Sequence, residues 1–493
     1  MKASSEIHQL IRSMSMSEKR HFKIHASRHV IGNENLYPQL FDAIARQESY
    51  DEDAIRRHFG ETAFGKNIAS GKNYLYQQVL ESLNVYNRDK TFLSRYANIL
   101  VSIENLYNRG LFSQCHKLIR RSKTEAYSLE KFSILLILLR WETIIHIKDE
   151  DERKLNRSMM EELRVTEMMR VQSALMRVAF NIQIQIDKGV RSADFIRENE
   201  KELKKNLPAS PEVDSFWAKY YYYSSKGLLC SIQGKQEERY QCYKEIKKLM
   251  DEAPQFIRDL PGIYHLNLNN LFNVMMFLGK YKEGEALIRQ QEEFMPAYDI
   301  KRPALSKIVF LNTCDNELYL FYKTGRFDDA AGLTRHIEHE VRAFRINFSP
   351  LLFDLMFMMA VSELMVGNYK NAQKWLNKII NSERDVYFRK ELQINSRLLY
   401  LVVLYDSDDL LLDNRITATR RFMQQEKQFH AQKKILESIR LLSDGASSRK
   451  NKNALLKLSS DIRKDMTKSF SEANNKQFDF SEWIDRKVKA VLG

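Results

Sequence analysis

Three short segments of one pattern decide the fold: Gly279-Lys280-Tyr281, Gly325-Arg326-Phe327 and Gly367-Asn368-Tyr369. Each segment follows a run of apolar residues with helical spacing, and a small residue stands five positions after each glycine. A glycine that ends one helix just before the next helix begins is typical of a helical hairpin. The pattern therefore predicts stacked helical hairpins over residues 263–380.

The composition agrees with an all-helical chain. The 493 residues are 44% hydrophobic and 29% charged, which is enough apolar sequence to form a core. The chain has 16 Gly and 8 Pro, both below average usage. Long helices with few turns are therefore expected, and a turn-rich β-protein is disfavoured.

The glycines recur at a nearly fixed interval. If Gly110, Gly234, Gly279, Gly325 and Gly367 are taken as equivalent, the last three steps are 45, 46 and 42 residues. Self-similarity at a fixed period indicates supersecondary units that cannot bury their apolar faces alone and so stack on each other. The Gly234 unit departs most, because Gln236 replaces the aromatic residue and Arg239 replaces the small residue.

The turn and the residues before it resemble the tetratricopeptide repeat. In that family the first helix carries apolar residues 11, 8, 7 and 4 positions before the glycine, and before Gly279 these are Leu268, Leu271, Phe272 and Met275. The step is about ten residues longer than the standard repeat, which predicts longer helices. The overall layout also resembles bacterial tetratricopeptide-like proteins of similar length, to which no activity is attached.

That resemblance implies an all-α chain, an α-solenoid of stacked antiparallel helical hairpins with a period of about 42–46 residues and helical caps. We expect a helical cap domain in residues 1–90, the repeat array in 91–412 and basic helices in 413–493. The function it implies is a non-catalytic scaffold or regulatory adaptor that binds a protein or peptide.

Charge suggests an alternative, a nucleic-acid-associated regulator. The formal net charge is +14, and residues 413–493 contain 18 Lys and Arg against 10 Asp and Glu. Residues 1–90 are nearly balanced, with 13 against 11. Either the N-terminal helical domain or the basic C-terminal helices could contact phosphates. So diffuse an excess is more typical of a solvated surface, and we rank this alternative second.

Location is inferred from what the sequence lacks. The first residues contain no apolar core of a secretory signal, and the longest apolar run, residues 134–139, is too short to span a membrane. The four cysteines are far apart and form no CxxC pair. We therefore expect a cytoplasmic protein with reduced cysteines and no membrane insertion.

No catalytic or cofactor site is expected. Residues 60–67 come close to a phosphate-binding loop, but Asn67 stands where Ser or Thr is needed. His21, His25 and His29 share one helix face at a spacing that can hold a metal, yet no further ligand follows in register. A polar stripe explains the three histidines better, so no metal site is predicted. An enzyme with an unrecognised site stays a third hypothesis.

The partner-binding residues follow from the family's geometry. The resemblance implies that first-helix residues facing away from the packed stripe line a groove. In this sequence those positions are Asn269, Asn273, Asn312, Asp315 and Tyr319. An Asn side chain offers both a donor and an acceptor to a peptide amide. The partner's identity, the biological process and the oligomeric state do not follow from the sequence.

Overall fold

A computed structural model describes residues 5–27, 36–60, 67–88, 92–188, 190, 192–207, 215–343, 350–382, 390–424, 429–444, 449–467 and 478–490. In these ranges all regular structure is helical, and no strand occurs. The chain divides into two compact units, Met1–Val165 and Thr166–Gly493. The predicted all-α fold is confirmed. The predicted divisions after residues 90 and 412 stay predictions.

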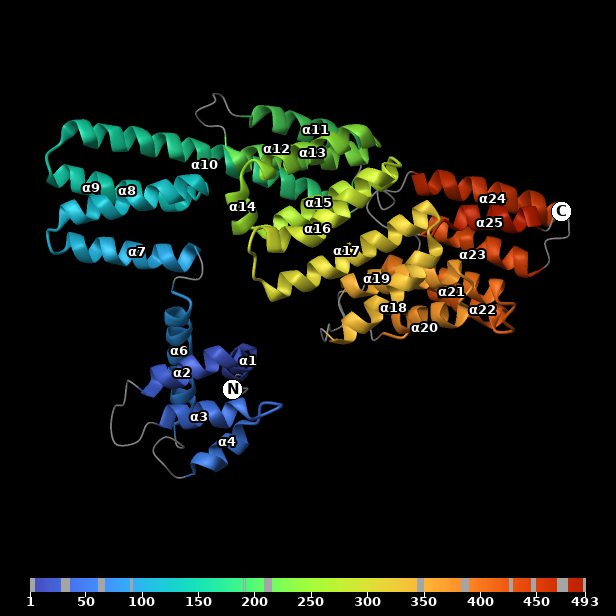
Figure 1. Ribbon diagram of the computed structural model, residues 1–493, viewed down its shortest axis with the longest axis horizontal. Helices are drawn as coiled ribbons and strands as arrows, with labels where there is room; N and C mark the ends of the chain where they lie inside the picture. Colours follow the sequence, from blue (N-terminus) through green and yellow to red (C-terminus); the bar gives the residue numbers. More distant parts are fainter. Residues whose placement is uncertain are drawn as a thin grey trace. The chain divides into compact units, whose positions relative to one another are not determined.

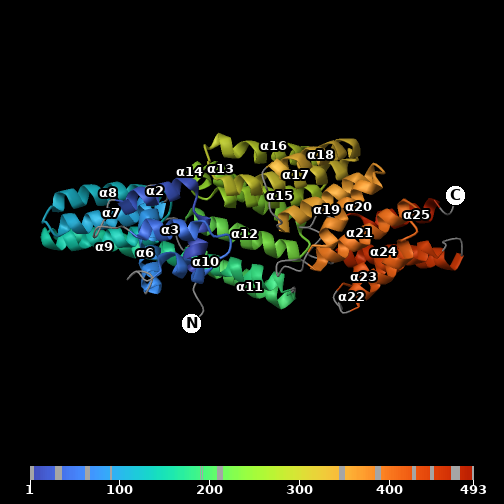
Figure 2. The same cartoon turned by 90° about the horizontal axis from the view of Figure 1, so that it is seen from below.

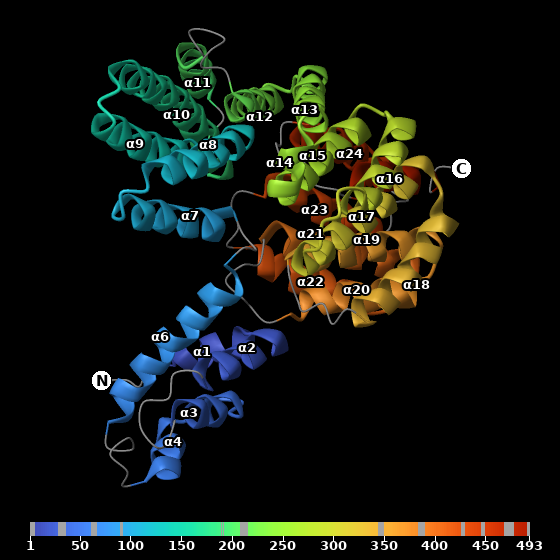
Figure 3. The ribbon, with the colours of Figure 1, turned by 60° about the vertical axis from the view of Figure 1, so that its left-hand side comes forward.

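The first unit consists of a small helical cluster followed by longer hairpins. Its helices are α1 (Glu6–Ser13), α2 (Met16–Ser27), α3 (Leu36–Ala45), α4 (Glu52–Phe59), α6 (Ile68–Tyr86), α7 (Phe92–Tyr107), α8 (Phe112–Ser128), α9 (Phe132–Lys148) and the start of α10 (Glu152–Asp187). Helices α1, α2 and α3 all pack on α6, around a core that includes Phe22, Phe41 and Leu75 (Figure 3). Helix α8 packs between α7 and α9.

The second unit contains the predicted repeat. After the rest of α10 its helices are α11 (Ala193–Lys205), α12 (Phe216–Ile232), α13 (Gln236–Asp251), α14 (Pro254–Asp259), α15 (Pro261–Phe277), α16 (Tyr281–Ala297), α17 (Pro303–Thr324), α18 (Phe327–Ala343), α19 (Pro350–Met365), α20 (Tyr369–Ile380), α21 (Lys390–Asp406), α22 (Leu412–Met423), α23 (His430–Ser443), α24 (Arg449–Thr467) and α25 (Phe480–Ala490). In Figure 1 the hairpins α15–α16, α17–α18 and α19–α20 follow one another in this unit.

The first helices of successive hairpins are direct neighbours. Helix α15 packs on α17, α17 on α19, and α19 on α21, and Figure 2 shows the same order. Each second helix packs on its own first helix and on the first helix of the next hairpin, as α16 does on α15 and α17. This is a tetratricopeptide-like solenoid, and the 17 to 22 residues of α15, α16 and α17 contribute to its long period.

The turn inside each hairpin has one geometry. Gly279, Gly325 and Gly367 have φ of 70°, 73° and 75°, the left-handed region in which glycine has no Cβ penalty. The next residue then donates its backbone N–H to the carbonyl five positions earlier, for example Lys280 to Met275 at 2.9 Å. This 6→1 bond satisfies a carbonyl that the helix end leaves unpaired.

The two earlier glycines adopt the same turn. Gly110 and Gly234 both have φ of 72°, and the N–H of Lys235 donates to the carbonyl of Cys230 at 2.9 Å. The predicted equivalence of the five glycines is therefore confirmed. In the Gly234 unit, Gln236 and Arg239 replace the aromatic and the small residue, and both are buried. The polar side chains therefore occupy the packing positions, and the turn at Gly234 is kept.

The predicted packing residues form the core of the hairpins. Leu268, Leu271, Phe272 and Met275 are all buried. The small residues after the turns, Gly284, Ala330 and Ala372, are buried as well. At Gly284 the reason is visible, since a Cβ there would lie 2.3 Å from the end of the Met276 side chain. Small residues therefore let the two helices of a hairpin approach each other.

The end of the second unit packs against the ends of two first helices. Phe478, Phe480 and Trp483 are buried. The indole Nε1 of Trp483 donates to the carboxylate of Asp406, at the end of α21, over 3.1 and 3.2 Å. The phenol oxygen of Tyr322 on α17 accepts a 3.0 Å bond from the backbone N–H of Asp479. The C-terminal helix is thus part of the repeat core.

Among the described helices, none combines the length and the apolar character that a bilayer span requires. The four cysteines are all buried and free.

The turn geometry makes a prediction about stability. Gly325→Ala should lower the free energy of unfolding by about 1 kcal/mol, because an alanine must adopt a left-handed conformation. Nothing lies within 4 Å of the position of the new Cβ, so the cost is conformational rather than steric. Urea denaturation followed by circular dichroism measures it.

A matched control is available at Asp299, which has φ of 51° between α16 and α17. There Asp299→Gly should raise the free energy of unfolding, by up to about 1 kcal/mol, since its ion pair with Lys301 is exposed and weak. A shift of both variants in the same direction would contradict this explanation of the turns.

Candidate functional site

The predicted partner-binding residues lie on two neighbouring helices. Asn269 and Asn273 are one turn apart on α15, and Asn312, Asp315 and Tyr319 follow one another on α17. All five are partly buried, and α15 packs directly on α17. The structure therefore brings the two predicted groups to adjacent first helices. Their role in binding stays a prediction.

His265, which the sequence did not single out, connects the two helices. It lies four residues before Asn269 on α15, is only 2% exposed, and accepts at Nε2 a 3.0 Å hydrogen bond from Nδ2 of Asn312. Its ring lies parallel to Phe294, with centroids 6.1 Å apart. We call the surface made by His265 and the five predicted residues the α15–α17 face.

The bond from Asn312 fixes the protonation of His265. Because Nε2 accepts, the neutral ring carries its proton on Nδ1 and can donate there. Burial lowers the pKa of His265 to about 4, so the ring is neutral at neutral pH. Nδ1 of His265 is itself buried and has no hydrogen-bond partner among the described protein atoms.

A complementary acceptor lies one helical turn away. Oδ1 of Asn269 is also buried and has no partner among the described protein atoms. Unpaired buried polar groups cost about 1–3 kcal/mol each and are rare in native proteins. The donor and the acceptor are four residues apart on α15, so they share one face of that helix.

The other end of the α15–α17 face is aromatic. Tyr319 lies 6.4 Å from Tyr322 between ring centroids, and the Lys323 ammonium lies 5.8 Å from the centroid of the Tyr319 ring. A flat, partly buried ring beside an amide-rich stripe can pack against an apolar side chain of a bound segment.

Two features of the sequence, the stripe of His21, His25 and His29 and the loop-like segment 60–67, are only partly within the described residues. His29 and residues 61–66 of the loop-like segment lie outside them. Nδ1 of His21 is 3.1 Å from Oγ of Ser82, and the His21 ring lies 5.2 Å from that of Tyr86. These contacts fit a packed polar stripe between α2 and α6, and the expectation of no metal at this stripe stays a prediction.

The sequence missed one group of possible metal ligands. Among the described residues, His116, Glu142 and His146 come together in the first unit with one ligand atom of each within 4.8 Å of the others. Only the four-residue spacing of Glu142 and His146 was available as a signal, because His116 belongs to a different helix.

Several cations of the basic C-terminal helices are paired with carboxylates. Arg440 pairs with Glu437 and Asp444, and Lys487 lies 2.9 Å from Asp406. Cations engaged with carboxylates contribute less to phosphate binding than free ones. Nucleic-acid binding stays an untested alternative.

Comparison of the sequence with protein-family profiles and with curated proteins gave no match. The structure is similar to the apo form of the quorum sensor NprR from B. thuringiensis, with 14% identity, a TM-score of 0.43 and coverage of 76% of this chain and 99% of that chain. NprR in complex with its cognate peptide NprX aligns with 14% identity, a TM-score of 0.38 and coverage of 71% and 98%.

A third similar structure is a signal transduction ATPase with numerous domains and a tetratricopeptide repeat sensor, from Pyrococcus horikoshii. It aligns with 14% identity, a TM-score of 0.41 and coverage of 88% of this chain and 66% of that chain. At these TM-scores the likenesses carry no argument about ligand or mechanism.

The buried His265 makes a prediction about pH. Its pKa of about 4 in the folded chain is below the ordinary value of 6.5, so between these values the unfolded state binds more protons. Its contribution to stability is complete above pH 6.5 and is lost as the pH falls toward 4. Between pH 7 and pH 5, His265 should therefore lower the free energy of unfolding by about 2 kcal/mol.

Urea denaturation of the wild-type chain and of His265→Gln at pH 7 and pH 5 checks this. The drop in the free energy of unfolding from pH 7 to pH 5 should be about 2 kcal/mol smaller in His265→Gln than in the wild type. His339→Gln is the control, because the His339 side chain is 79% exposed, and it should behave like the wild type. An equal loss in His265→Gln and wild type would show that His265 is not buried as a neutral ring.

Proposed function

We propose that the chain is a non-catalytic scaffold or regulatory adaptor that binds a peptide or protein segment in extended conformation on the α15–α17 face. The observation that supports this most directly is a pair of buried polar atoms, Nδ1 of His265 and Oδ1 of Asn269, that have no hydrogen-bond partner among the described protein atoms. One donates and the other accepts, which is the complement of a peptide backbone.

The spacing of the pair suits an extended segment. Four residues along a helix correspond to about 6 Å, and two residues of an extended chain span about 6.6 Å. Peptide groups two residues apart point to the same side of an extended segment. A carbonyl could therefore accept from His265 while an N–H two residues away donates to Asn269.

The neighbouring residues extend the same surface in both directions. Asn273 stands one turn beyond Asn269 on α15, and Asp315 and Tyr319 stand beyond Asn312 on α17. Amide groups bind backbone without regard to side-chain identity, so sequence preference would come from the aromatic end near Tyr319. Asn269 is only partly buried, so its side chain would have to rotate to turn Oδ1 toward a bound segment.

A selected peptide tests the proposal. Peptides that bind the full chain are selected from a random displayed library, and their Kd is measured for wild type and for Asn269→Ala with Asn273→Ala. The double variant should bind at least about 10-fold more weakly, a loss of one to two hydrogen bonds. Its thermal stability should be unchanged, since Oδ1 of Asn269 has no partner to lose.

Gln241→Ala provides the control. This amide is exposed on the second helix α13, so its removal should leave the Kd unchanged. Equal affinity of the Asn269→Ala, Asn273→Ala chain and wild type for every selected peptide would remove the α15–α17 face from the proposal.

The nucleic-acid alternative is tested separately by a gel shift. If the basic helices bound phosphates, retardation in a gel shift at low salt would be expected, falling steeply as salt rises. No retardation at low salt would exclude that alternative.

A further inference from the structure

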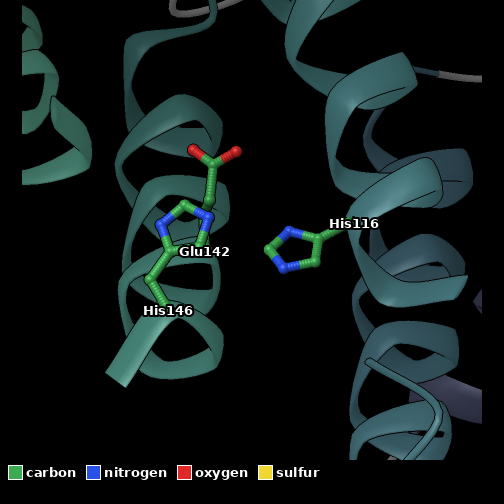
Figure 4. Close-up of side chains that lie close together, drawn as sticks. All are labelled: His116, Glu142 and His146. Atoms are coloured by element: carbon green, nitrogen blue, oxygen red, sulfur yellow. The ribbon is translucent and has the colours of Figure 1, made fainter. Parts of the chain in front are cut away.

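A polar cluster in the first unit, remote in sequence from the α15–α17 face, has the composition of a metal site. Glu142 and His146 are four residues apart on α9, so they share one face of that helix. His116 comes from the adjoining helix α8. Figure 4 shows His116 projecting from its helix toward Glu142 and His146, and one ligand atom of each lies within 4.8 Å of the others.

The ring of His146 is held in the form that binds a metal. Its Nδ1 lies 3.0 Å from Oγ of Ser158, and that hydroxyl donates its own proton to the carbonyl of Lys154 at 3.1 Å. Ser158 must therefore accept from Nδ1–H, which leaves the lone pair of His146 on Nε2.

His116 is oriented in the same way by a carboxylate. Its Nε2 lies 3.1 Å from Oδ2 of Asp149, and an ionised carboxylate can only accept. The proton of the neutral ring is then on Nε2, and the lone pair is on Nδ1. Metal-binding histidines in proteins usually donate their other ring N–H to a carboxylate or another acceptor in this manner.

Glu142 keeps one oxygen for a ligand. Nζ of Lys123 lies 2.7 Å from Oε2 of Glu142 and 2.9 Å from Oε2 of Glu161. Because Lys123 contacts Glu142 through a single oxygen, Oε1 can bind an ion while Lys123 keeps both carboxylates. A hydrogen-bonded carboxylate is also the usual form of a metal-ligating one.

The cluster is reachable from solvent and its charge is partly balanced. His116, Glu142 and His146 line an open cavity of about 630 Å³. Of the cations around it, Lys123 is paired as above and Lys154 with Asp151. Lys117, Arg120 and Arg157 are exposed, where water and salt screen their repulsion of an ion.

We propose that His116, Glu142 and His146 bind a divalent transition-metal ion, Zn²⁺ fitting best, with the remaining coordination position open toward the cavity. Two nitrogen ligands and one carboxylate oxygen are a set that Zn²⁺ accepts. Ligands of a tetrahedral ion lie roughly 3.3 Å apart, so the three side chains must close by rotamer changes when the ion enters.

Asp149 and Ser158 are positioning residues in this proposal, because each holds one ring nitrogen and so directs the other toward the ion. Their removal should weaken metal binding without abolishing it, and by less than the removal of a ligand does.

The test uses the full chain without an affinity tag, in reducing buffer, with Zn²⁺ added in isothermal titration calorimetry and Co²⁺ added for its visible absorption. Wild type should bind one equivalent of either ion. His116→Ala and Glu142→Gln should each weaken binding at least about 10-fold, and Asp149→Asn should weaken it to a smaller extent. His339→Ala, which removes an exposed histidine, should leave binding unchanged.

Circular dichroism and thermal melting of each variant confirm that the fold is kept. His116 and Glu142 are only partly buried, so their variants remain informative if His146→Ala does not fold. No binding by wild type would overturn the proposal, as would equal binding by wild type and His116→Ala. A sulfur-to-cobalt charge-transfer band would place the ion on a cysteine and would overturn it too.

Discussion

The left-handed turn that ends each first helix is the constraint on which the repeat depends. A residue with φ near 70° lets the next N–H reach back to the carbonyl five positions earlier, and the chain then reverses into the second helix. Because this geometry recurs at Gly279, Gly325 and Gly367, successive hairpins present the same face to one another. The first helices α15, α17, α19 and α21 are neighbours for that reason.

The same geometry explains what the sequence could and could not predict. Where glycine occupies the left-handed position, the turn was visible, and the all-α tetratricopeptide-like fold was predicted correctly. Among the described residues, Glu130, Glu150, Asp299 and Asp408 also have positive φ, and the residue after Asp299 makes the same kind of bond, Ile300 to Met295 at 2.8 Å. Without glycine these turns carry no such sequence signal.

The Gly234 unit shows that packing tolerates more than a pattern of residue types suggests. Arg239 occupies the position of a small residue, yet it is 1% exposed and its guanidinium lies 5.5 Å from the centroid of the Tyr243 ring. The long side chain is accommodated by stacking on an aromatic ring. A large side chain in place of a small one therefore did not prevent this segment from forming the hairpin.

Functional groups were harder to predict than the fold, because they depend on contacts between helices. The five predicted residues of the α15–α17 face came from the groove geometry that the resemblance to the tetratricopeptide repeat implies. His265 could not be, since its importance comes from the bond with Asn312 across 47 residues. The cluster of His116, Glu142 and His146 forms only when α8 packs on α9. The sequence spacing of residues 116 and 142 does not predict that contact.

The two polar sites differ in what completes them. On the α15–α17 face a buried donor and a buried acceptor lack partners among the described protein atoms, and a backbone can supply both. In the cluster of His116, Glu142 and His146, one nitrogen of each ring already contacts Asp149 or Ser158. The lone pair of the other ring nitrogen can bind a cation. In the two proposals the repeat therefore binds peptide groups on one face, and the first unit binds an ion in a pocket.

Hydrogen exchange followed by mass spectrometry, with and without a selected peptide, tests the central claim most directly. Binding on the α15–α17 face predicts slower exchange in α15 and α17, with little change in the second helices α16 and α18. Protection confined to α16 and α18, or to helices outside this pair of hairpins, would contradict it.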